Sequence, residues 1–436
     1  MSLNYFVGIV RRAQAVLLAL VFAAAFCAAQ ATGPVIEVPN PPNTAAQQTK
    51  HYVVLVSLDG FRYDYARKYN AQNLLALAAR GASAPGGMIP SYPSVTFPNH
   101  YTIVTGLYPE HHGIVANTFS DPARKDSYTY TDPNAVRDGS WYGGTPLWVL
   151  AEKQGMRAAC LFWPGSEAEI QGKRPSYYLH YDGSFPDEKR VDRVLAWLRL
   201  PPELRPHFIT LYYVNVDYAG HKHSPDSPEV AEAVAHVDTM IGRLATGLAS
   251  LHLPVDLMVV SDHGEAAAQK EWTYLDKFTD LTHFQVAGNV VTTLLYPDSE
   301  AAAEKAYEDL RGASDKFQVY RRANTPAHLH YDANPRSGDP IVVATGPSYI
   351  RAHEALSFGD PHNTDPGQHG YDPSLVPDMK AIFFAAGPDI RAGVAVEPFE
   401  NVNIYPLITA ILGLRAGSVD GRLSVLRGIL VNHPRN

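Results

Sequence analysis

Continuous apolar runs recur along the chain and alternate with stretches of helical periodicity. Residues 51–58 end in Val-Val-Leu-Val-Ser-Leu, and such a run is typical of a strand covered on both faces of a parallel sheet. Similar runs occupy 156–162, 208–216, 255–261 and 381–386. Helical patterns are clearest at 187–199 and 228–251. The alternation predicts an α/β fold with a doubly wound, mostly parallel central sheet flanked by helices.

The stretch from about 315 to 375 breaks this regularity, because it is rich in Pro, Gly, Asn, Asp and His. We interpret it as a long-loop insertion that returns to the sheet edge, not as a separate domain. The chain has 436 residues, of which 46% are hydrophobic, so a single large core is possible. We therefore expect residues 50–436 to form one domain with loop insertions.

The first 31 residues have the pattern of a signal peptide. Arg11 and Arg12 precede an uncharged apolar run over 13–29, and Ala29-Gln30-Ala31 is a small-x-small cleavage pattern. The run is short for a membrane span, so an uncleaved anchor is the less favoured alternative. Residues 32–49, rich in Pro, Asn, Thr and Gln, predict a flexible tether. We expect an exported protein, periplasmic or secreted, with no membrane span in the mature chain.

Charge and cysteine content exclude some functions. Removal of the two arginines in residues 1–31 changes the formal net charge from −8 to −10. An acidic protein is poorly suited to stable nucleic-acid binding, which requires basic patches. Cys160 is the only cysteine after residue 31, so an intramolecular disulfide is impossible in the mature chain, and we expect it to be a buried core residue.

Acidic and histidine side chains follow three of the apolar runs. The ligand crevice of a parallel sheet lies beyond the carboxyl ends of its strands, so these side chains should converge. A further histidine lies in a later loop, in the motif Gly367-Gln-His-Gly370. Taken singly, an Asp here is a common turn former and a His is often just hydrogen-bonded in the core. Taken together, three Asp and three His suffice for two divalent metals, and mixed carboxylate and imidazole ligands suit zinc. The six are Asp59, Asp217, His221, Asp262, His263 and His369.

A hydroxyl group completes the candidate site. Thr96 lies where a proline-broken loop, with prolines at 90, 93 and 98, should lead into a helix. Ser and Thr at this place are usually N-caps, but a helix N-terminus also stabilises an anion or an alkoxide. Both interpretations remain open from this stretch alone.

The chain resembles the nucleotide pyrophosphatase/phosphodiesterase family of the alkaline phosphatase superfamily, from about Tyr52 to Leu414. The matching segments are Leu55-Val-Ser-Leu-Asp-Gly-Phe-Arg62, Pro93-Ser-Val-Thr-Phe-Pro-Asn-His100, Gly106-Leu-Tyr-Pro-Glu-His-His-Gly113, Phe162-Trp-Pro-Gly-Ser166, Asp217-Tyr-Ala-Gly-His221, Ser261-Asp-His-Gly264 and Gln368-His-Gly-Tyr-Asp372. The resemblance implies an alkaline-phosphatase-like fold and a catalytic phosphodiesterase domain that acts on a small-molecule nucleotide or phosphodiester substrate.

The resemblance also implies roles for individual residues. Asp217, His221 and His369 would bind one Zn²⁺, and Asp59, Thr96, Asp262 and His263 a second. Thr96 would be the nucleophile and would form a covalent phosphothreonine, because zinc activates a hydroxyl that is otherwise a poor nucleophile. Asn117 would stabilise a non-bridging phosphate oxygen. Phe97 and Tyr181 would stack on the nucleobase. The products would be nucleoside 5′-monophosphates.

Two other functions would also use a site of this kind, and one residue departs from the family pattern. The first alternative is a phosphodiesterase of choline-type head groups such as glycerophosphocholine, which would need an aromatic cage for the quaternary amine. The second is a zinc-binding protein without catalysis, which would have no use for Thr96 or Asn117. Many relatives place Met after Ser261-Asp-His-Gly264, whereas Glu265 follows here. This difference puts the local loop shape in question, but not the ligands before it.

Overall fold

The computed structural model describes residues 34–269, 272–353 and 365–431. The predicted signal peptide lies outside them. No helix in these ranges is both long and apolar enough to cross a bilayer.

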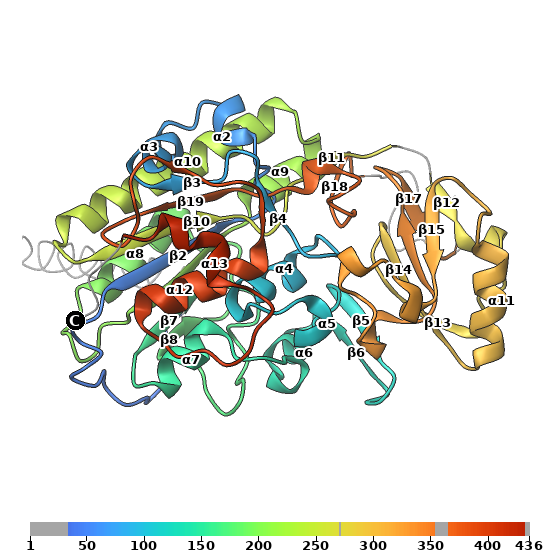
Figure 1. Cartoon of the computed structure of the whole chain (residues 1–436), viewed down its shortest axis with the longest axis horizontal. Helices are drawn as coiled ribbons and strands as arrows, with labels where there is room; N and C mark the ends of the chain where they lie inside the picture. The colour runs from blue at the N-terminus through green and yellow to red at the C-terminus, as the bar shows by residue number, and fades with distance from the viewer. Residues whose placement is uncertain (1–33, 270–271, 354–364, 432–436) are drawn as a thin grey trace, which may run out of the picture.

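A nine-stranded sheet forms the centre of the described chain, in the order β1-β8-β7-β9-β2-β10-β19-β3-β20 (Figure 1). The five strands from β8 to β10 are parallel to their neighbours, and β1 and β19 run antiparallel on either side of them. The bounds are β1 Ile36–Glu37, β8 Tyr177–Leu179, β7 Ala158–Leu161, β9 Phe208–Tyr213, β2 Tyr52–Leu58, β10 Val255–Val260, β19 Phe383–Ala386, β3 Ala82–Ser83 and β20 Val394–Ala395. The doubly wound, mostly parallel sheet is confirmed, and all five apolar runs contribute strands.

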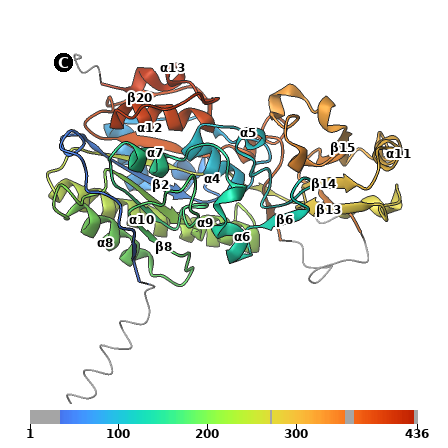
Figure 2. The same cartoon turned by 90° about the horizontal axis from the view of Figure 1, so that it is seen from below.

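Helices cover both faces of this sheet (Figure 2). Alternate residues of β2 explain the layers: Val53 and Leu55 join one buried cluster, whereas Val54 and Val56 join the other. The first cluster includes residues of α4, α7 and α12, and the second includes residues of α3, α8 and α10. The helices are α2 Tyr65–Lys68, α3 Gln72–Arg80, α4 Thr96–Thr105, α5 Pro109–His112, α6 Pro133–Arg137, α7 Leu147–Lys153, α8 Asp187–Leu198, α9 Asn215–His223, α10 Pro228–Ser250, α11 Glu300–Leu310, α12 Ile404–Leu412 and α13 Leu423–Leu426. The two predicted helices correspond to α8 and α10.

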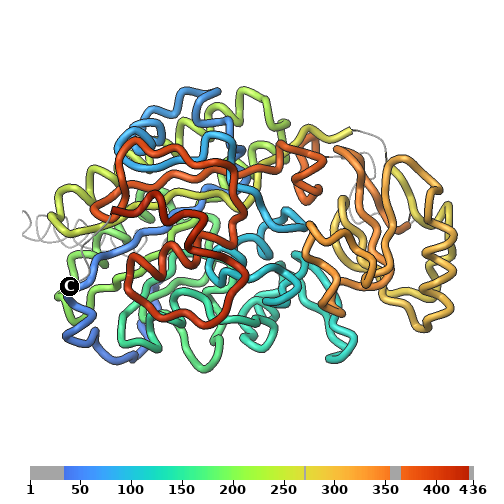
Figure 3. Tube along the Cα trace, in the orientation of Figure 1, coloured from blue at the N-terminus to red at the C-terminus, as the bar shows by residue number. Residues whose placement is uncertain are grey.

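Much of the expected insertion at 315–375 belongs to a folded lobe that begins earlier in the chain, seen in yellow and orange at the right of Figures 1 and 3. It contains a four-stranded antiparallel sheet in the order β13-β14-β16-β15, and α11. One face of the sheet forms its own core around Leu295 and Val342, while Leu294 and Ile341 on the other face belong to the main core. The lobe was missed because its strands are short and separated by turn residues. Their bounds are β13 Phe284–Gly288, β14 Thr292–Pro297, β15 Phe317–Tyr320 and β16 Ile341–Ala344.

The remaining described strands form small pairs around the main sheet and the lobe. The pair β11–β18 closes the base of the insertion, and β12 pairs with β17 inside it. Their bounds are β4 Met88–Ile89, β5 Thr118–Asp121, β6 Asp126–Thr129, β11 Ala266–Ala267, β12 Trp272–Tyr274, β17 Tyr349–Arg351, β18 Gly367–Gln368 and β21 Phe399–Glu400. Cys160 on β7 is fully buried, as expected.

The segment 34–49 is packed against the sheet edge, so the predicted flexible tether is wrong for it. Ile36 and Glu37 pair with β8, and the buried side chain of Asn43 makes three hydrogen bonds. Its Nδ2 donates to the carbonyls of Pro202 at 2.8 Å and Arg205 at 2.7 Å, and its Oδ1 accepts from the Arg157 N–H at 2.7 Å. These long-range contacts outweigh the loop-like composition of the segment.

We expect Asn43→Ala to lower the free energy of unfolding by about 2–4 kcal/mol, because it leaves a buried N–H and two carbonyls without partners. Urea denaturation measures this change. Thr49→Ala is the control, since its exposed hydroxyl donates only to the nearby Ala46 carbonyl, and its effect should stay within about 0.5 kcal/mol. Equal stability of the two variants would show that the segment is not held as described.

Candidate metal centre

The candidate ligands meet at the carboxyl ends of three adjacent central strands, β9, β2 and β10. Asp59 directly follows β2, and Asp262 and His263 follow β10. The strand predicted over 208–216 ends earlier, at Tyr213, and α9 begins at Asn215. This helix places Asp217 and His221 four residues apart, on one face. The convergence expected from strand order is therefore present, with one pair of ligands carried by a helix.

Asp59, Asp262 and His263 form the first ligand set, and all three are buried. One potential ligand atom from each lies within 4.8 Å of the other two. His263 Nε2 is 2.9 Å from Asp262 Oδ2 and 3.6 Å from Asp59 Oδ1. The Thr96 hydroxyl lies 3.5 Å from the same nitrogen. Thr96 therefore borders this set.

Asp217, His221 and His369 form the second set, also within 4.8 Å of one another. Asp217 Oδ1 is 3.5 Å from His221 Nε2 and 3.6 Å from His369 Nε2. The two imidazole Nε2 atoms are 3.1 Å apart. The rings of His263 and His369 stack with centroids 3.7 Å apart, so the two sets are adjacent.

All three histidines are oriented in the same way, through a backbone carbonyl. Nδ1 of His221 faces the Gly367 carbonyl at 2.9 Å, that of His263 faces Gly264 at 3.0 Å, and that of His369 faces Ser94 at 3.0 Å. A carbonyl only accepts, so each Nδ1 carries the proton and each Nε2 presents a lone pair. This tautomer is the one that a metal ligand needs, and the carbonyls act as its outer hydrogen-bond partners.

The carboxylates show why cations fit here. Asp59 Oδ1, Asp217 Oδ1 and Asp262 Oδ2 are buried and accept no hydrogen bond from the described residues. Burial, then repulsion from Asp262 and Asp217, raises the pKa of Asp59 well above its ordinary value. Burial lowers the pKa of His369 well below its ordinary value, and the nearby imidazoles of His263 and His221 lower it further, so the His369 ring stays neutral. Burial lowers the pKa of His263, but the Asp262 carboxylate outweighs this effect and raises it. Orphaned carboxylate oxygens and imidazole nitrogens together form a donor set suited to divalent metals.

Thr96 is the first residue of α4, and Val95, in an extended conformation, occupies the N-cap position. The loop-to-helix junction was predicted correctly, but the interpretation of Thr96 as a cap is wrong by one residue. Its hydroxyl points instead toward His263. Pro98 has no N–H, and the N–H groups of Phe97 and Asn99 donate to Asn117 Oδ1 and to the Val95 carbonyl. The positive end of the dipole of this ten-residue helix therefore lies beside the Thr96 hydroxyl.

Asn117 is fixed by the turn that carries Thr96. Its Oδ1 accepts from the backbone N–H of Phe97 at 2.9 Å, so its Nδ2 is the group left to donate. The Phe97 ring contacts Tyr128 and Tyr130, with centroids 6.2 and 5.8 Å away. These contacts seat Phe97 in an aromatic cluster at the start of α4.

Two exposed tyrosines lie near the metal ligands. Tyr181 is 49% exposed, and its ring contacts Phe162 and Tyr212. Tyr130 is 48% exposed and was not predicted. Partial burial raises the pKa of Tyr130, and the charges of Asp217 and Asp59 raise it further. Large aromatic rings left half-exposed beside a charged site are available to a ligand.

Two buried residues that support the site were also missed. The Tyr212 hydroxyl donates to Asp59 Oδ2 at 2.5 Å. His100 lies between the Thr96 carbonyl and the Ser57 hydroxyl, at 2.8 Å from each, and is 3.4 Å from Asp262. The position of His100, four residues after Thr96, was a usable signal, because it places both on one face of a helix. Nothing in the local pattern around Tyr212 marks it among the other strand residues.

Glu265 lies directly behind the second ligand set. It is fully buried, and neither carboxylate oxygen accepts a hydrogen bond from the described residues. Its Oε1 is 3.6 Å from His221 Nδ1. Glycine at position 220 leaves room for the Glu265 carboxylate, since a Cβ on residue 220 would lie 1.5 Å from Glu265 Oε2. The residue that departs from the family pattern is thus placed to polarise the His221 imidazole.

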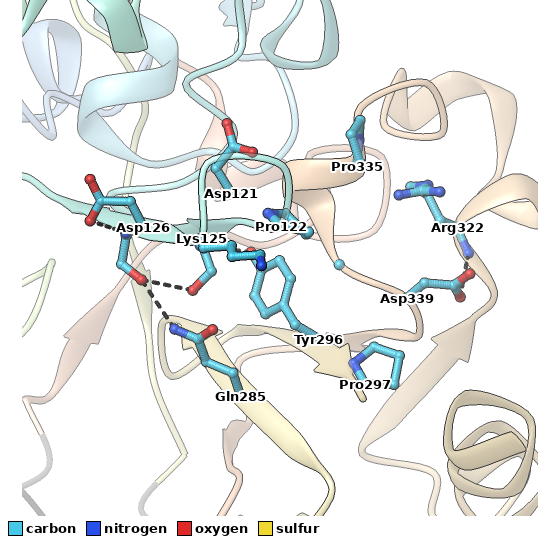
Figure 4. Close-up of a pocket in the computed structure, with 13 residues that line it drawn as sticks. Asp121, Pro122, Lys125, Asp126, Gln285, Tyr296, Pro297, Arg322, Pro335 and Asp339 are labelled. Carbon is cyan, nitrogen blue, oxygen red and sulfur yellow. Dashed lines mark hydrogen bonds between the residues drawn. The ribbon is translucent and has the colours of Figure 1, made fainter. Parts of the chain in front are cut away.

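A cavity of about 490 Å³ opens elsewhere, between the β5–β6 hairpin and the inserted lobe (Figure 4). It is lined by Asp121, Lys125, Gln285, Tyr296 and Asp339, among others, and includes no member of the two ligand sets. The chemistry-bearing side chains are therefore gathered away from this cavity.

Residues 53–372 match the family described as Type I phosphodiesterase / nucleotide pyrophosphatase. The chain is 37% identical over 396 residues to an uncharacterised pyrophosphatase/phosphodiesterase of Schizosaccharomyces pombe, which covers 86% of this chain and 80% of that protein. It is 34% identical over 405 residues to human ectonucleotide pyrophosphatase/phosphodiesterase family member 1, which covers 90% of this chain and 43% of the human protein.

The fold is also similar to that of murine ectonucleotide pyrophosphatase/phosphodiesterase 5, solved as an inactive threonine-to-alanine variant in complex with AMP. The TM-score is 0.81 at 30% identity, over 88% of this chain and 100% of that chain. Fold and paired ligand sets define a metal-dependent α/β hydrolase. The chain belongs to the nucleotide pyrophosphatase/phosphodiesterase family of the alkaline phosphatase superfamily.

Burial, then repulsion from Asp217, raises the pKa of Glu265 well above its ordinary value, and a cation bound nearby would favour its ionised form. We expect Glu265→Gln, which cannot ionise, to weaken metal binding at the Asp217–His221–His369 set by about 10–100-fold. Competition with a chromophoric chelator measures the affinity of the metal-free protein for added zinc. Glu308→Gln is the control, since Glu308 is exposed on α11. Unchanged affinity in Glu265→Gln would mean that the Gly367 carbonyl alone orients His221.

Proposed function

We propose that the protein is a two-zinc hydrolase that cleaves phosphodiester and pyrophosphate bonds of nucleotides and releases nucleoside 5′-monophosphates. One observation carries this proposal: three imidazoles and three orphaned carboxylate oxygens form two adjacent sets, one of which borders a helix-terminal hydroxyl. Family membership and the AMP complex of the murine relative support the nucleotide class.

Each ligand set would hold one zinc ion. Asp217, His221 and His369 would hold the first, and Asp59, Asp262 and His263, with the Thr96 hydroxyl, the second. Zinc fits because the donors combine imidazole and carboxylate, and three protein ligands leave room for substrate. When bound, the ions would lower the pKa of a hydroxyl or water and neutralise negative charge that develops on the phosphate.

Thr96 Oγ1 would attack the phosphorus atom after losing its proton. The bond from phosphorus to the leaving oxygen breaks, that oxygen takes up a proton, and a phosphothreonine diester forms. Water then attacks phosphorus and breaks its bond to Oγ1, which restores the hydroxyl and releases the monophosphate. The positive end of the α4 dipole favours the anionic phosphate beside Thr96.

Asn117 and the aromatic residues would position the substrate. The Asn117 Nδ2 can donate to a non-bridging oxygen, and as a neutral donor it suits the single charge of a diester. Phe97 and Tyr181 would stack on the nucleobase, and Tyr130, beside Phe97, would extend that surface.

We also propose that residues 1–31 are a signal peptide and that the protein acts after export. The ectonucleotidase names of its relatives fit this location.

We expect Thr96→Ala to reduce hydrolysis of an aryl phosphodiester by about 10⁴–10⁶-fold, because the nucleophile is lost. Zinc content, measured by mass spectrometry, should remain, since the Asp and His ligands are intact. Thr96→Ser keeps a hydroxyl and is the matched control, with activity within about tenfold of the unsubstituted protein.

The same preparations should be tested on a panel of substrates. A dinucleotide and an aryl phosphodiester should be cleaved much faster than the matching monoester, a sulfate ester or glycerophosphocholine. Preference for the monoester or the sulfate would contradict a diesterase, and preference for glycerophosphocholine would indicate the choline head-group class. Zinc-loaded protein with no activity on any of these esters would indicate a storage function.

We expect Asn117→Ala to lower kcat/KM for the diester by about 10²–10³-fold, since it removes a donor to the developing charge. Thr118→Ala is the control, because its hydroxyl bonds only to Thr129 at 3.1 Å on the neighbouring strand. Equal kcat/KM values in the two variants would remove Asn117 from the substrate site.

A further inference from the structure

A third group of Asp and His residues lies at the opposite, amino-terminal end of the same central strands. His51 immediately precedes β2, and Asp256 is the second residue of β10. Asp389 lies in the loop after β19, the next strand in the sheet. Seven residues of β2 separate His51 from Asp59, so at about 3.3 Å per residue the group lies roughly 25 Å from the proposed active site.

The three side chains are close enough to share one ion. A potential ligand atom from each lies within 4.8 Å of the others. His51 Nδ1 is 2.6 Å from Asp389 Oδ2, and the Asp389 backbone N–H donates to Asp256 Oδ1 at 3.0 Å. The donor set, two carboxylates and one imidazole, is the same as that of Asp59, Asp262 and His263.

A second, independent observation points to a ligand. Asp256 is fully buried, yet its Oδ2 accepts no hydrogen bond from the described residues. Gly387 lets the loop close on this carboxylate, because a Cβ there would lie 2.3 Å from Asp256 Oδ1. An orphaned buried carboxylate oxygen is costly unless a cation or a proton satisfies it.

Charge and backbone support favour a cation of charge two. Asp256 and Asp389 place carboxylate oxygens within 4.8 Å of each other, so their like charges repel unless a cation or a proton lies between them. A divalent ion would neutralise both carboxylates. The His51 backbone is held in place, since its carbonyl faces His207 Nδ1 at 3.0 Å and the His207 ring stacks on Tyr52. An imidazole among the three ligands that the described residues supply favours zinc over calcium, which takes six to eight oxygen ligands.

We propose that His51, Asp256 and Asp389 bind a structural zinc ion that ties the amino ends of β2 and β10 to the loop after β19. The site is separate from the catalytic pair of ligand sets. Water would complete its coordination. Because it joins three segments of the folded chain, zinc bound there stabilises the native state over the unfolded one.

The test compares zinc content and stability in full-length protein after dialysis against zinc chloride. Asp256→Asn and, as a milder second variant, His51→Ala should each contain about one zinc ion per chain fewer than the unsubstituted protein. Zinc should raise the melting temperature less in these variants. Diester kcat/KM should remain within about twofold, because no catalytic ligand changes.

His252→Asn is the matched control, an exposed histidine near the start of β10 whose left-handed backbone Asn tolerates. Its zinc content and stability should be unchanged. If Asp256→Asn does not fold, His51→Ala decides the result. The proposal would be overturned if His51→Ala held as much zinc as the unsubstituted protein and showed the same zinc-dependent rise in melting temperature. Asp256 and Asp389 would then share a proton instead of binding an ion. The measurement is the difference of one zinc ion per chain between a variant and the unsubstituted protein. Its result therefore does not depend on whether the protein cleaves nucleotides.

Discussion

Repulsion among buried carboxylates is the constraint on which this structure depends. Asp59 and Asp262 offer oxygens within 4.8 Å of each other in a fully buried site. At an effective dielectric constant of about 20, two like charges at that separation repel by about 3–4 kcal/mol. This is a large share of the 5–15 kcal/mol that stabilises a typical domain. The proposed zinc ions would offset this repulsion, and a sheet packed on both faces holds the candidate ligands in place.

The backbone decides how the imidazoles are used. His221, His263 and His369 come from a helix, a strand end and a late loop, yet each directs Nδ1 at a carbonyl and Nε2 inward. The Ser94 side chain adds to this arrangement, because its hydroxyl donates to the Tyr371 carbonyl and accepts from the Gly370 N–H. The loop before α4 therefore orients a metal ligand as well as leading to Thr96.

Strands β2 and β10 carry the same kind of donor set at both ends. We propose a catalytic role for the set at the carboxyl ends and a structural role for the set at the amino ends. At the carboxyl ends the ligands face the Thr96 hydroxyl and exposed aromatic rings, as a reacting site requires. At the amino ends a loop closes over Asp256, and the proposed ion would join chain segments there. The difference lies in what surrounds each set, since the donors alone are alike.

The sequence by itself determined the covered parallel strands and the start of a helix near Thr96, and it indicated six Asp and His residues as candidate ligands, because apolar runs and the residues that end them are local patterns. Only the tertiary structure decided that residues 34–49 pack on the sheet edge and that the insertion forms a lobe. It also placed Tyr212 on Asp59 and Glu265 behind His221. The contacts of residues 34–49, Tyr212 and Glu265 join positions more than forty residues apart, so no local pattern contains them. The lobe pairs short strands that turn residues separate, and their pattern resembles that of a loop. A buried carboxylate such as Glu265 becomes informative only once its neighbours are known.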